Sequence, residues 1–363
     1  MARKMIIAGG GTGGHIFPAI AIANALRAQD PDIEILFVGA KGKMEMEKVP
    51  QAGFPIEGLD IAGFNRSSLI KNIGLPFKLI KSFFQVRRIF SAFQPDAVLG
   101  VGGYSSFPVL RLAQQKSIPS FIHESNSFAG KSNILLGKRA TKIFVAAGGM
   151  EKFFPAAKIV VTGNPVRLSI TDSKVSREEA IRFFKLDPAH TTVLSVGGSL
   201  GAKSINEALD ARLEEWQKKG IQLIWQTGKP YAVTAAERTS ANPMVRSFDF
   251  ITRMDMAYAA ADVVISRAGA MAIAELRVVG KPSILVPYPF AAEDHQTANA
   301  VALVNQRAAV MVKDADAMNE LVPTALKLAE DDNRKQELKK NIQHMAIADA
   351  DKRIASAILE ELK

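Results

Sequence analysis

One phrase occurs twice in this chain and limits its fold more than any other feature: an apolar run, a cluster of glycines and the start of a helix. The first copy is Met5-Ile-Ile-Ala-Gly-Gly-Gly-Thr-Gly-Gly14, and the second is Val193-Leu-Ser-Val-Gly-Gly-Ser-Leu-Gly-Ala202. Glycine permits a tight turn from a buried strand into a helix and lets backbone N–H groups approach a phosphate. Because one copy opens each half of the chain, the sequence predicts two α/β domains in tandem.

Short β-rich runs alternate with helical stretches in both halves, which favours parallel sheets covered by helices on both faces. The predicted strands are Lys4–Ala8, Ile33–Val38, Ala97–Gly100, Ser120–His123, Lys142–Ala146, Thr192–Val196, Gln222–Trp225, Val263–Ser266, Ser283–Val286 and Ala309–Val312. The expected fold class is α/β, with two Rossmann-like, doubly wound domains. Ligands of such sheets lie outside the carboxyl ends of the strands, so two facing domains would line a cleft with their strand-to-helix turns.

The domain boundary is predicted in the stretch Thr162-Gly-Asn-Pro-Val-Arg167, which contains glycine and proline. This gives an N-terminal domain of residues 1–163 and a C-terminal domain of residues 164–344. The remaining helix, at about 345–363, is a candidate to pack back on the first domain.

Composition restricts the protein's environment and partners. There is no cysteine, which excludes thiol catalysis, and no apolar run reaches the roughly 18 residues of a membrane span. The N-terminus lacks a signal-peptide core, so we expect a cytoplasmic protein. Residues 1–163 carry 20 Lys and Arg against 10 Asp and Glu, whereas residues 164–363 carry 26 of each. A basic first half indicates a nucleic acid, an anionic membrane surface or a merely solubilising surface.

The two glycine turns do not match the common nucleotide motifs fully. Gly9, Gly11 and Gly14 form Gly-x-Gly-x-x-Gly, but the second strand ends in Gly39-Ala-Lys41, without the acid that holds a ribose in dehydrogenases. An NADP enzyme with its 2′-phosphate on Lys41 stays open. The second turn nearly matches a P-loop, but Ala202 replaces its second glycine, which excludes an NTPase. It still offers N–H groups and the Ser199 hydroxyl to a diphosphate.

Two residues are candidates for the base that transfer to a hydroxyl requires. His15 directly follows the first glycine turn, and histidine titrates near neutrality; the alternative is a histidine that caps its helix. Glu124 ends a strand in His123-Glu-Ser-Asn126, where Asn126 can donate to a sugar oxygen. A third glycine turn, Gly100-Val-Gly-Gly-Tyr104, can take a second diphosphate that belongs to the acceptor.

Polar groups suited to a nucleotide sugar follow the strands of the second half. The backbone after Phe248 can read a base edge, and the Glu275 carboxylate can accept both ribose hydroxyls, although an ion pair with Arg277 or Lys281 is the alternative. Gln296 and Asn299 can bond sugar hydroxyls, and Arg167 can pair with a phosphate. These groups stand at strand ends or helix starts, as the fold class requires of a site.

Together these motifs resemble the MurG family, the UDP-N-acetylglucosamine:undecaprenyl-diphospho-muramoyl-pentapeptide N-acetylglucosaminyltransferases of bacterial cell-wall synthesis. The resemblance covers nearly the whole chain and rests on Gly10-Gly-Thr-Gly-Gly-His15, Gly102-Gly-Tyr104, His123-Glu-x-Asn126, Gly163-Asn-Pro-Val-Arg167, Gly197-Gly-Ser199, Ser266-Arg-x-Gly269, Glu275 and Asp294-His-Gln-x-x-Asn299. It implies a GT-B fold, an inverting transfer that makes lipid II from lipid I, and a last helix that crosses back to the first domain.

The resemblance also implies residue roles. Ile251 would read uracil through its backbone, Glu275 would hold the ribose, Gln296 would hold the N-acetylglucosamine, and Ala270 to Glu275, with Met271, would face the diphosphate. The remaining implied donor contacts are Thr12, Gly13, Gly14, Asn126, Arg167 and Ser199. The family motif does not settle the base; His15 is our choice and Glu124 the rival. His295 stands where some relatives carry a second glutamine, which puts its sugar contact in doubt.

The lipid acceptor of this family agrees with a basic, aromatic segment at residues 72–90, which includes Phe77, Phe84 and Arg88. Such a helix can lie in a membrane interface, so the expected location is peripheral, on the cytoplasmic face of the bacterial plasma membrane. The expected partners are UDP-GlcNAc, the lipid-linked muramoyl-pentapeptide and an anionic membrane surface, without nucleic acid. No cofactor or metal is expected, because the three Asp-x-Asp pairs, as at Asp30 and Asp32, lie away from the motifs. The alternatives are another GT-B lipid glycosyltransferase and an NADP-dependent oxidoreductase.

Overall fold

The computed structural model describes residues 2–62, 74–198, 200–291 and 294–363. The chain divides into two compact units: Met1–Arg167 together with Asp349–Lys363, here the N-unit, and Leu168–Ala348, here the C-unit. The predicted boundaries, at residues 163/164 and about 345, lie a few residues from these bounds.

The N-unit is built on a parallel sheet of seven strands in the order β3-β2-β1-β4-β5-β6-β7. Its strands are β1 Lys4–Ala8, β2 Glu34–Ala40, β3 Ile56–Leu59, β4 Ala97–Gly100, β5 Ser120–Glu124, β6 Lys142–Val145 and β7 Ile159–Val161. The sequence did not predict β3 and β7, the two edge strands. Glu57 and Gly58 interrupt the apolar pattern of β3, and β7 has three residues.

Helices cover both faces of this sheet. They are α1 Gly13–Gln29, α2 Glu45–Gln51, α3 Leu75–Phe93, α4 Ser106–Gln115, α5 Lys131–Gly137 and α16 Ala350–Glu360. Met5 and Ile7 of β1 join one core cluster with α1, α2 and α16, whereas Ile6 and Ala8 join another with α3, α4 and α5. This alternation explains the continuous apolar sequence of β1, since a strand with two covered faces must be apolar on both.

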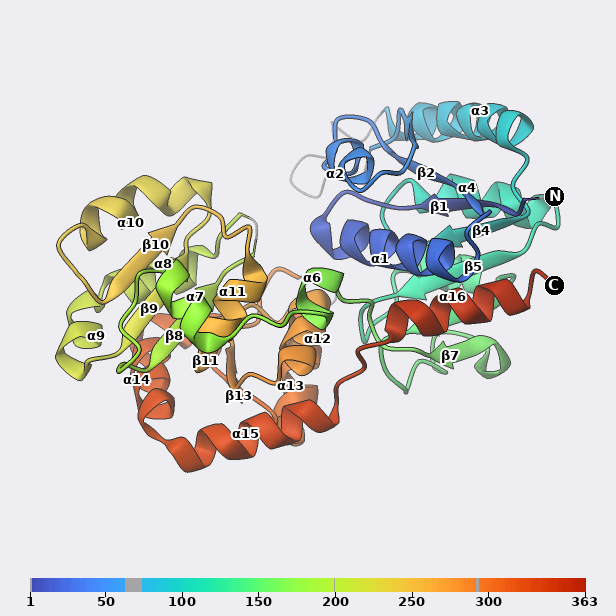
Figure 1. Cartoon of the computed structure of the whole chain (residues 1–363). Coiled ribbons are helices and arrows are strands. Elements are labelled where there is room, and N and C mark those ends of the chain that lie inside the picture. Colours follow the sequence, from blue (N-terminus) through green and yellow to red (C-terminus); the bar gives the residue numbers. More distant parts are fainter. Residues whose placement is uncertain (1, 63–73, 199, 292–293) are drawn as a thin grey trace. The chain divides into compact units, whose positions relative to one another are not determined.

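The last helix of the chain belongs to the N-unit. Figure 1 shows α16 (red) beside α1 (blue), and Ile354 and Ile358 of α16 are fully buried. The Ser356 hydroxyl donates to Gln29 Oε1 at 3.0 Å, and Lys142 pairs with Glu361 at 2.9 Å. The C-terminal helix is therefore part of the N-unit core.

The C-unit repeats the arrangement with a parallel sheet of six strands in the order β10-β9-β8-β11-β12-β13. Its strands are β8 Thr192–Val196, β9 Gln222–Gln226, β10 Val245–Phe248, β11 Val263–Ser266, β12 Ser283–Leu285 and β13 Val310–Met311. Its helices are α6 Leu168–Thr171, α7 Arg177–Phe183, α8 Lys203–Asp210, α9 Leu213–Lys219, α10 Ala232–Thr239, α11 Met254–Ala260, α12 Ala270–Val279, α13 His295–Asn305, α14 Ala317–Glu330 and α15 Asp332–His344. In both units the first strand lies inside the sheet and its glycine turn follows it.

Candidate active site

The glycine turn of the N-unit joins β1 to α1. Gly10 has φ +147°, and a Cβ there would lie 2.3 Å from the Glu45 carboxyl group, so only glycine fits. Thr12 is the exposed N-cap of α1, but no side chain caps the helix and no acid stands in its first turn. The N–H groups at Gly13 and Gly14 thus begin an uncapped helix, which suits an anion.

His15 lies between two glycine turns. Its Nδ1 is 3.1 Å from the Gly10 carbonyl oxygen, and a Cβ at Gly102 would lie 2.8 Å from its Nε2. A carbonyl only accepts, so Nδ1 carries the proton and Nε2 of the neutral ring is the basic nitrogen. In that tautomer, Nε2 of the half-buried His15 is the ring nitrogen that can accept a proton.

The third glycine turn packs directly on the first. The Gly10 N–H donates to the Gly102 carbonyl at 3.3 Å, and the Ser106 hydroxyl donates to Gly102 and to Ala8 at 2.9 and 2.8 Å. Tyr104 stands beside this turn with 55% of its surface exposed. These bonds fix the backbone on which His15 rests.

Glu45, which sequence reasoning missed, lies beneath the first turn. Its carboxylate is 1% exposed and accepts the N–H of Gly11 at 2.8 Å and of Ala40 at 3.0 Å. An acid is thus present near the end of β2, but α2 supplies it and backbone amides hold it. Its position depends on tertiary packing, so no local sequence signal reveals it.

The Glu124 carboxylate accepts four hydrogen bonds. Asn126 donates its N–H and its side-chain amide to Oε1 at 3.1 and 3.2 Å. Gly130 N–H and Asn133 Nδ2 donate to Oε2 at 3.1 and 2.8 Å. Because a carboxylate has about four lone-pair positions, Glu124 is engaged in ordering the loop after β5, and the Asn126 amide group is turned toward it.

His123 is buried beside this loop. Burial, and secondarily the nearby His15, lowers the pKa of His123 from 6.5 to about 4. Asn164, which follows β7, donates its Nδ2 to the Ser125 carbonyl at 2.9 Å. His123 is therefore neutral near pH 7 in the folded protein.

Acidification from pH 6.5 to 4 is expected to destabilise the protein through His123. The unfolded chain binds a proton that the folded chain excludes over this range, so the free energy of unfolding falls as the pH falls, by roughly 3 kcal/mol in total. Urea midpoints at pH 7 and pH 5 should show a smaller pH dependence for His123→Gln than for wild type. If the urea midpoint changed equally with pH in both proteins, His123 would not be the cause of the pH-dependent stability.

Arg167 lies at the N-terminus of α1. Its guanidinium carbon is 4.8 Å from the centroid of the Phe17 ring, a cation–π contact, and that ring approaches Gly13. This stacking holds a cation beside the uncapped end of α1. The phosphate contact of Arg167 stays a prediction.

In the C-unit, the glycine turn follows β8 and leads into α8. Ser199, the predicted donor contact of this turn, lies outside the described residues. Gly198 O accepts from Gln226 Nε2 at 3.1 Å, and Gln226 Oε1 accepts the Ile251 N–H at 2.9 Å. The backbone of Ile251 is predicted to read uracil, and its N–H already has a partner in Gln226.

Glu275 lies in the second turn of α12 and is 7% exposed. The hydroxyl of Tyr258, from α11, donates to Glu275 Oε2 at 2.9 Å. Ala270 and Met271 begin the helix after the N-cap Gly269 and are half-buried. The carboxylate that we assigned to the ribose is thus oriented by a tyrosine rather than placed on the helix surface.

A polar network fixes the turn after β11. Arg267 donates to the Val286 carbonyl at 3.1 Å and to the Ser204 hydroxyl at 3.0 Å. It also pairs with Asp314, so the expectation that all three Asp-x-Asp pairs lie away from the motifs is wrong for this one. The buried Asn299 donates to the Ala268 carbonyl at 3.2 Å, so its role in this structure is to hold the turn. Nearby, Gln296 Oε1 accepts the Tyr288 N–H at 3.0 Å. The oxygen of this side chain is therefore engaged by the protein backbone, and its Nε2 carries the two N–H donors that can bond a ligand.

Several helices that follow interior strands begin without a cap, as α3, α10 and α13 also do. Helices α1, α4, α5, α8 and α12 each have neither a capping side chain nor an acid in the first turn. By contrast, Ser176 and Asp331 cap α7 and α15, and acids follow both caps. Acids are normally favourable at a helix N-terminus, but the N–H groups at these helix starts have no first-turn acid beside them and can receive an anion.

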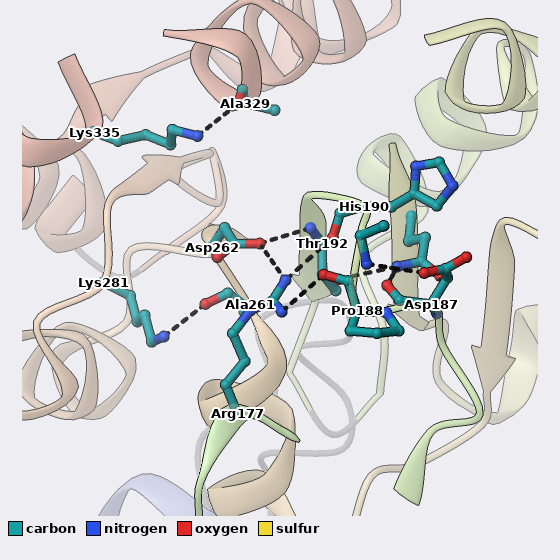
Figure 2. Close-up of polar contacts among 12 residues, drawn as sticks. Arg177, Asp187, Pro188, His190, Thr192, Ala261, Asp262, Lys281, Ala329 and Lys335 are labelled. Carbon is teal, nitrogen blue, oxygen red and sulfur yellow. Dashed lines mark hydrogen bonds and ion pairs between the residues drawn. The ribbon is translucent and has the colours of Figure 1, made fainter. Parts of the chain in front are cut away.

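A separate cavity of about 310 Å³ in the C-unit adjoins the opposite, amino ends of β11 and β12. Its Lys281 donates to the Ala261 carbonyl at 2.6 Å, and its Lys335 donates to the Ala329 carbonyl at 2.7 Å (Figure 2). Asp262 accepts the Thr192 N–H at 2.8 Å. Both lysines bond the last carbonyls of helices, a stabilising arrangement, and the cavity is not part of the candidate site.

In the part of the chain that the structure describes, no three His, Asp or Glu side chains lie close enough together to hold a metal ion. No helix in the described ranges has the length and apolarity that crossing a bilayer requires.

Comparisons with known proteins cover nearly the whole chain. Residues 5–145 match the glycosyltransferase family 28 N-terminal domain, and residues 192–354 match the family 28 C-terminal domain. A UDP-N-acetylglucosamine–N-acetylmuramyl-(pentapeptide) pyrophosphoryl-undecaprenol N-acetylglucosamine transferase of Parabacteroides distasonis is 51% identical over 98% of each chain. The protein of the same name from Bacteroides fragilis is 50% identical over 99% of this chain and 96% of its own.

Solved structures confirm the predicted GT-B fold with two Rossmann-like domains. The crystal structure of Acinetobacter baumannii MurG aligns with a TM-score of 0.77 and 29% identity over 99% of each chain. A UDP-GlcNAc 2-epimerase from Neisseria meningitidis aligns with a TM-score of 0.70 but 13% identity, so it shares the fold alone. The chain belongs to glycosyltransferase family 28 and, within it, to the family of UDP-N-acetylglucosamine–N-acetylmuramyl-(pentapeptide) pyrophosphoryl-undecaprenol N-acetylglucosamine transferases.

Proposed function

We propose that this protein transfers N-acetylglucosamine from UDP-N-acetylglucosamine to the muramoyl 4-hydroxyl of undecaprenyl-diphospho-muramoyl-pentapeptide. This reaction converts lipid I to lipid II in peptidoglycan synthesis. The observation that carries the proposal is the match, at about half identity over nearly the whole chain, to curated transferases of this name. The uncapped starts of α1 and α12 and the contact between His15 Nδ1 and the Gly10 carbonyl support the proposal.

The donor is assigned mainly to the C-unit. Glu275 holds the ribose, Ile251 reads the uracil, and Gln296 bonds the sugar through the donors of its Nε2. The N-terminus of α12, with Ala270 and Met271, stabilises the diphosphate as negative charge grows on it. The further proposed contacts are Thr12, Gly13, Gly14, Tyr104, Asn126, Arg167, Ser199 and Asn299.

His15 is proposed as the base and Glu124 as a positioning residue. Nε2 of His15 is the basic nitrogen of its neutral ring, because Nδ1 donates to Gly10. Glu124 already accepts four hydrogen bonds from its own loop, so protonating it would break that order. As UDP leaves C1 through an oxocarbenium-like transition state, the muramoyl hydroxyl attacks the opposite face and passes its proton to His15.

A transfer assay tests the function. Purified protein is mixed with radiolabelled UDP-GlcNAc and a muramoyl-diphospho-lipid acceptor, and label in the extracted lipid is counted. We expect label in the lipid with UDP-GlcNAc and little with UDP-glucose or UDP-GalNAc. Transfer to diacylglycerol instead would indicate a different lipid glycosyltransferase, and tight binding of NADPH without transfer would indicate an oxidoreductase.

We further propose that α3 contacts an anionic membrane from the cytoplasmic face, where UDP-sugars are made, so that the enzyme is peripheral. Phe77, Ile80 and Phe84 are 74, 56 and 65% exposed, and their spacing puts them on one side of the helix. Lys78 and Arg88, also exposed, flank them. An apolar stripe edged by cations is typical of interfacial helices, and each cation contributes about 1 kcal/mol near an anionic surface.

Replacement of both Phe77 and Phe84 by serine is expected to weaken binding to anionic vesicles by at least about tenfold, because each buried phenyl ring contributes about 1.5–3 kcal/mol. Co-sedimentation with vesicles that contain phosphatidylglycerol measures the effect. Val233→Ser, at a 72% exposed position of the C-unit, is the control and should bind like wild type. If the wild-type protein bound neutral and anionic vesicles equally, the proposed electrostatic contribution to membrane binding would be wrong.

A further inference from the structure

A buried glutamine links the two C-unit segments to which the donor is assigned. Gln226 is the last residue of β9, which lies between β8 and β10. Its Nε2 donates to the Gly198 carbonyl in the turn after β8, and its Oε1 accepts the N–H of Ile251 in the segment after β10. One side chain thus joins the loops that leave both neighbouring strands.

The orientation of this amide is determined by its partners. Gly198 offers a carbonyl, which only accepts, and Ile251 offers an N–H, which only donates. Gln226 is 3% exposed and Ile251 is 4% exposed, so water does not readily replace either bond. The segment is also anchored by Thr227, whose N–H donates to the Phe248 carbonyl at 2.9 Å, so the sheet does not depend on Gln226.

We propose that Gln226 is a positioning residue that sets the base specificity of the donor site by holding the backbone of Ile251 in register with the diphosphate turn. This inference rests on the proposed function, in which Ile251 reads uracil. While Gln226 occupies the N–H, the carbonyl of Ile251 is the group that meets the base. A carbonyl accepts from N3–H of uracil but faces an unprotonated N3 in cytosine, so it selects a uridine nucleotide over a cytidine nucleotide.

The same strand supplies a matched control. Gln222 begins β9, is 2% exposed, and also joins loop backbone through both amide atoms: Oε1 accepts the Asp187 N–H at 2.7 Å and Nε2 donates to the Asp187 carbonyl at 2.8 Å. It lies at the amino end of the strand, away from the glycine turn. Gln222→Met and Gln226→Met therefore remove the same kind of bonds at opposite ends of one strand.

The test measures binding of UDP and of CDP by calorimetry, and kcat/KM for UDP-GlcNAc and CDP-GlcNAc. Wild type should prefer the uridine ligand by at least about tenfold, since one unpaired buried polar group costs about 1–3 kcal/mol. Gln226→Met should lose most of that preference, whereas Gln222→Met should keep the wild-type ratio even if its melting temperature falls. Gln226→Glu, which retains an acceptor for Ile251, should restore the preference but bind UDP more weakly.

An equal loss of both ligands in Gln226→Met, or the same change of ratio in Gln222→Met, would overturn the inference. The binding arm needs no acceptor and no turnover. A changed UDP-to-CDP ratio without sugar transfer would therefore contradict the proposed function alone, and normal transfer with an unchanged ratio would contradict the inference alone.

Discussion

His15→Ala is expected to lower kcat for transfer from UDP-GlcNAc by about 10²–10⁴, the usual contribution of a general base, with little change in the KM for the donor. The residue lies on backbone that Glu45 and Gly102 hold independently of its ring, so the fold should survive. Steady-state kinetics with a lipid I analogue measure the loss. His15→Gln should be nearly as slow, since its amide has no basic nitrogen.

Glu124→Gln is the matched comparison, because Glu124 is the rival base. In this variant an NH₂ group, which cannot accept a hydrogen bond, replaces one of the two carboxylate oxygens. The loop then loses either the bonds from Gly130 and Asn133 or those from Asn126. We expect a lower unfolding midpoint and a smaller loss of kcat than in His15→Ala. Near-normal kcat in both His15→Ala and Glu124→Ala would show that neither residue is the base.

Glu275→Ala is expected to lower kcat/KM for UDP-GlcNAc by about 10²–10³, because hydrogen bonds from two ribose hydroxyls to a carboxylate contribute about 1.5–3 kcal/mol each. The variant also leaves the buried Tyr258 hydroxyl without this acceptor. A donor that lacks the ribose 2′-hydroxyl provides the direct measurement. It should be a much poorer substrate than UDP-GlcNAc for wild type, and nearly as good as UDP-GlcNAc for Glu275→Ala.

Tyr258→Phe separates recognition from packing in this test. It keeps the ring buried between α11 and α12 but removes the hydroxyl that orients Glu275, so it should lose less of kcat/KM than Glu275→Ala. If Glu275→Ala discriminates against the deoxy donor as strongly as wild type does, Glu275 does not hold the ribose.

Much of the fold was predictable because the repeated glycine phrase and the alternation of strands and helices are local patterns. All ten predicted strands are present in the described residues. The edge strands β3 and β7 were missed, and of the edge strand β10 only the end at Phe248 was recognised, because edge strands need less apolar sequence than central ones. The boundaries of the predicted strands lie within two residues of the observed ones, as with Val310–Met311.

The site was predictable only where a residue type is itself a chemical signal. The glycines and His15 were recognisable because a strand precedes them and a helix follows. Glu45 and Gln226 were not, since their roles arise from backbone groups that distant segments bring to them. The sequence also does not reveal which hydrogen bonds a candidate residue already makes. The Glu124 carboxylate accepts bonds from its own loop, and the Ile251 N–H donates to Gln226.

The most direct measurement of the central claim is the anomeric configuration of the product made from α-linked UDP-GlcNAc and a muramoyl-diphospho-lipid, determined by NMR. Direct displacement of UDP by a hydroxyl that His15 deprotonates predicts a single β-linked N-acetylglucosamine on the muramoyl 4-hydroxyl, with one UDP released per disaccharide. An α-linked product would contradict the single displacement. Recovery of an epimerised UDP-sugar with no label in the lipid would contradict the transfer itself.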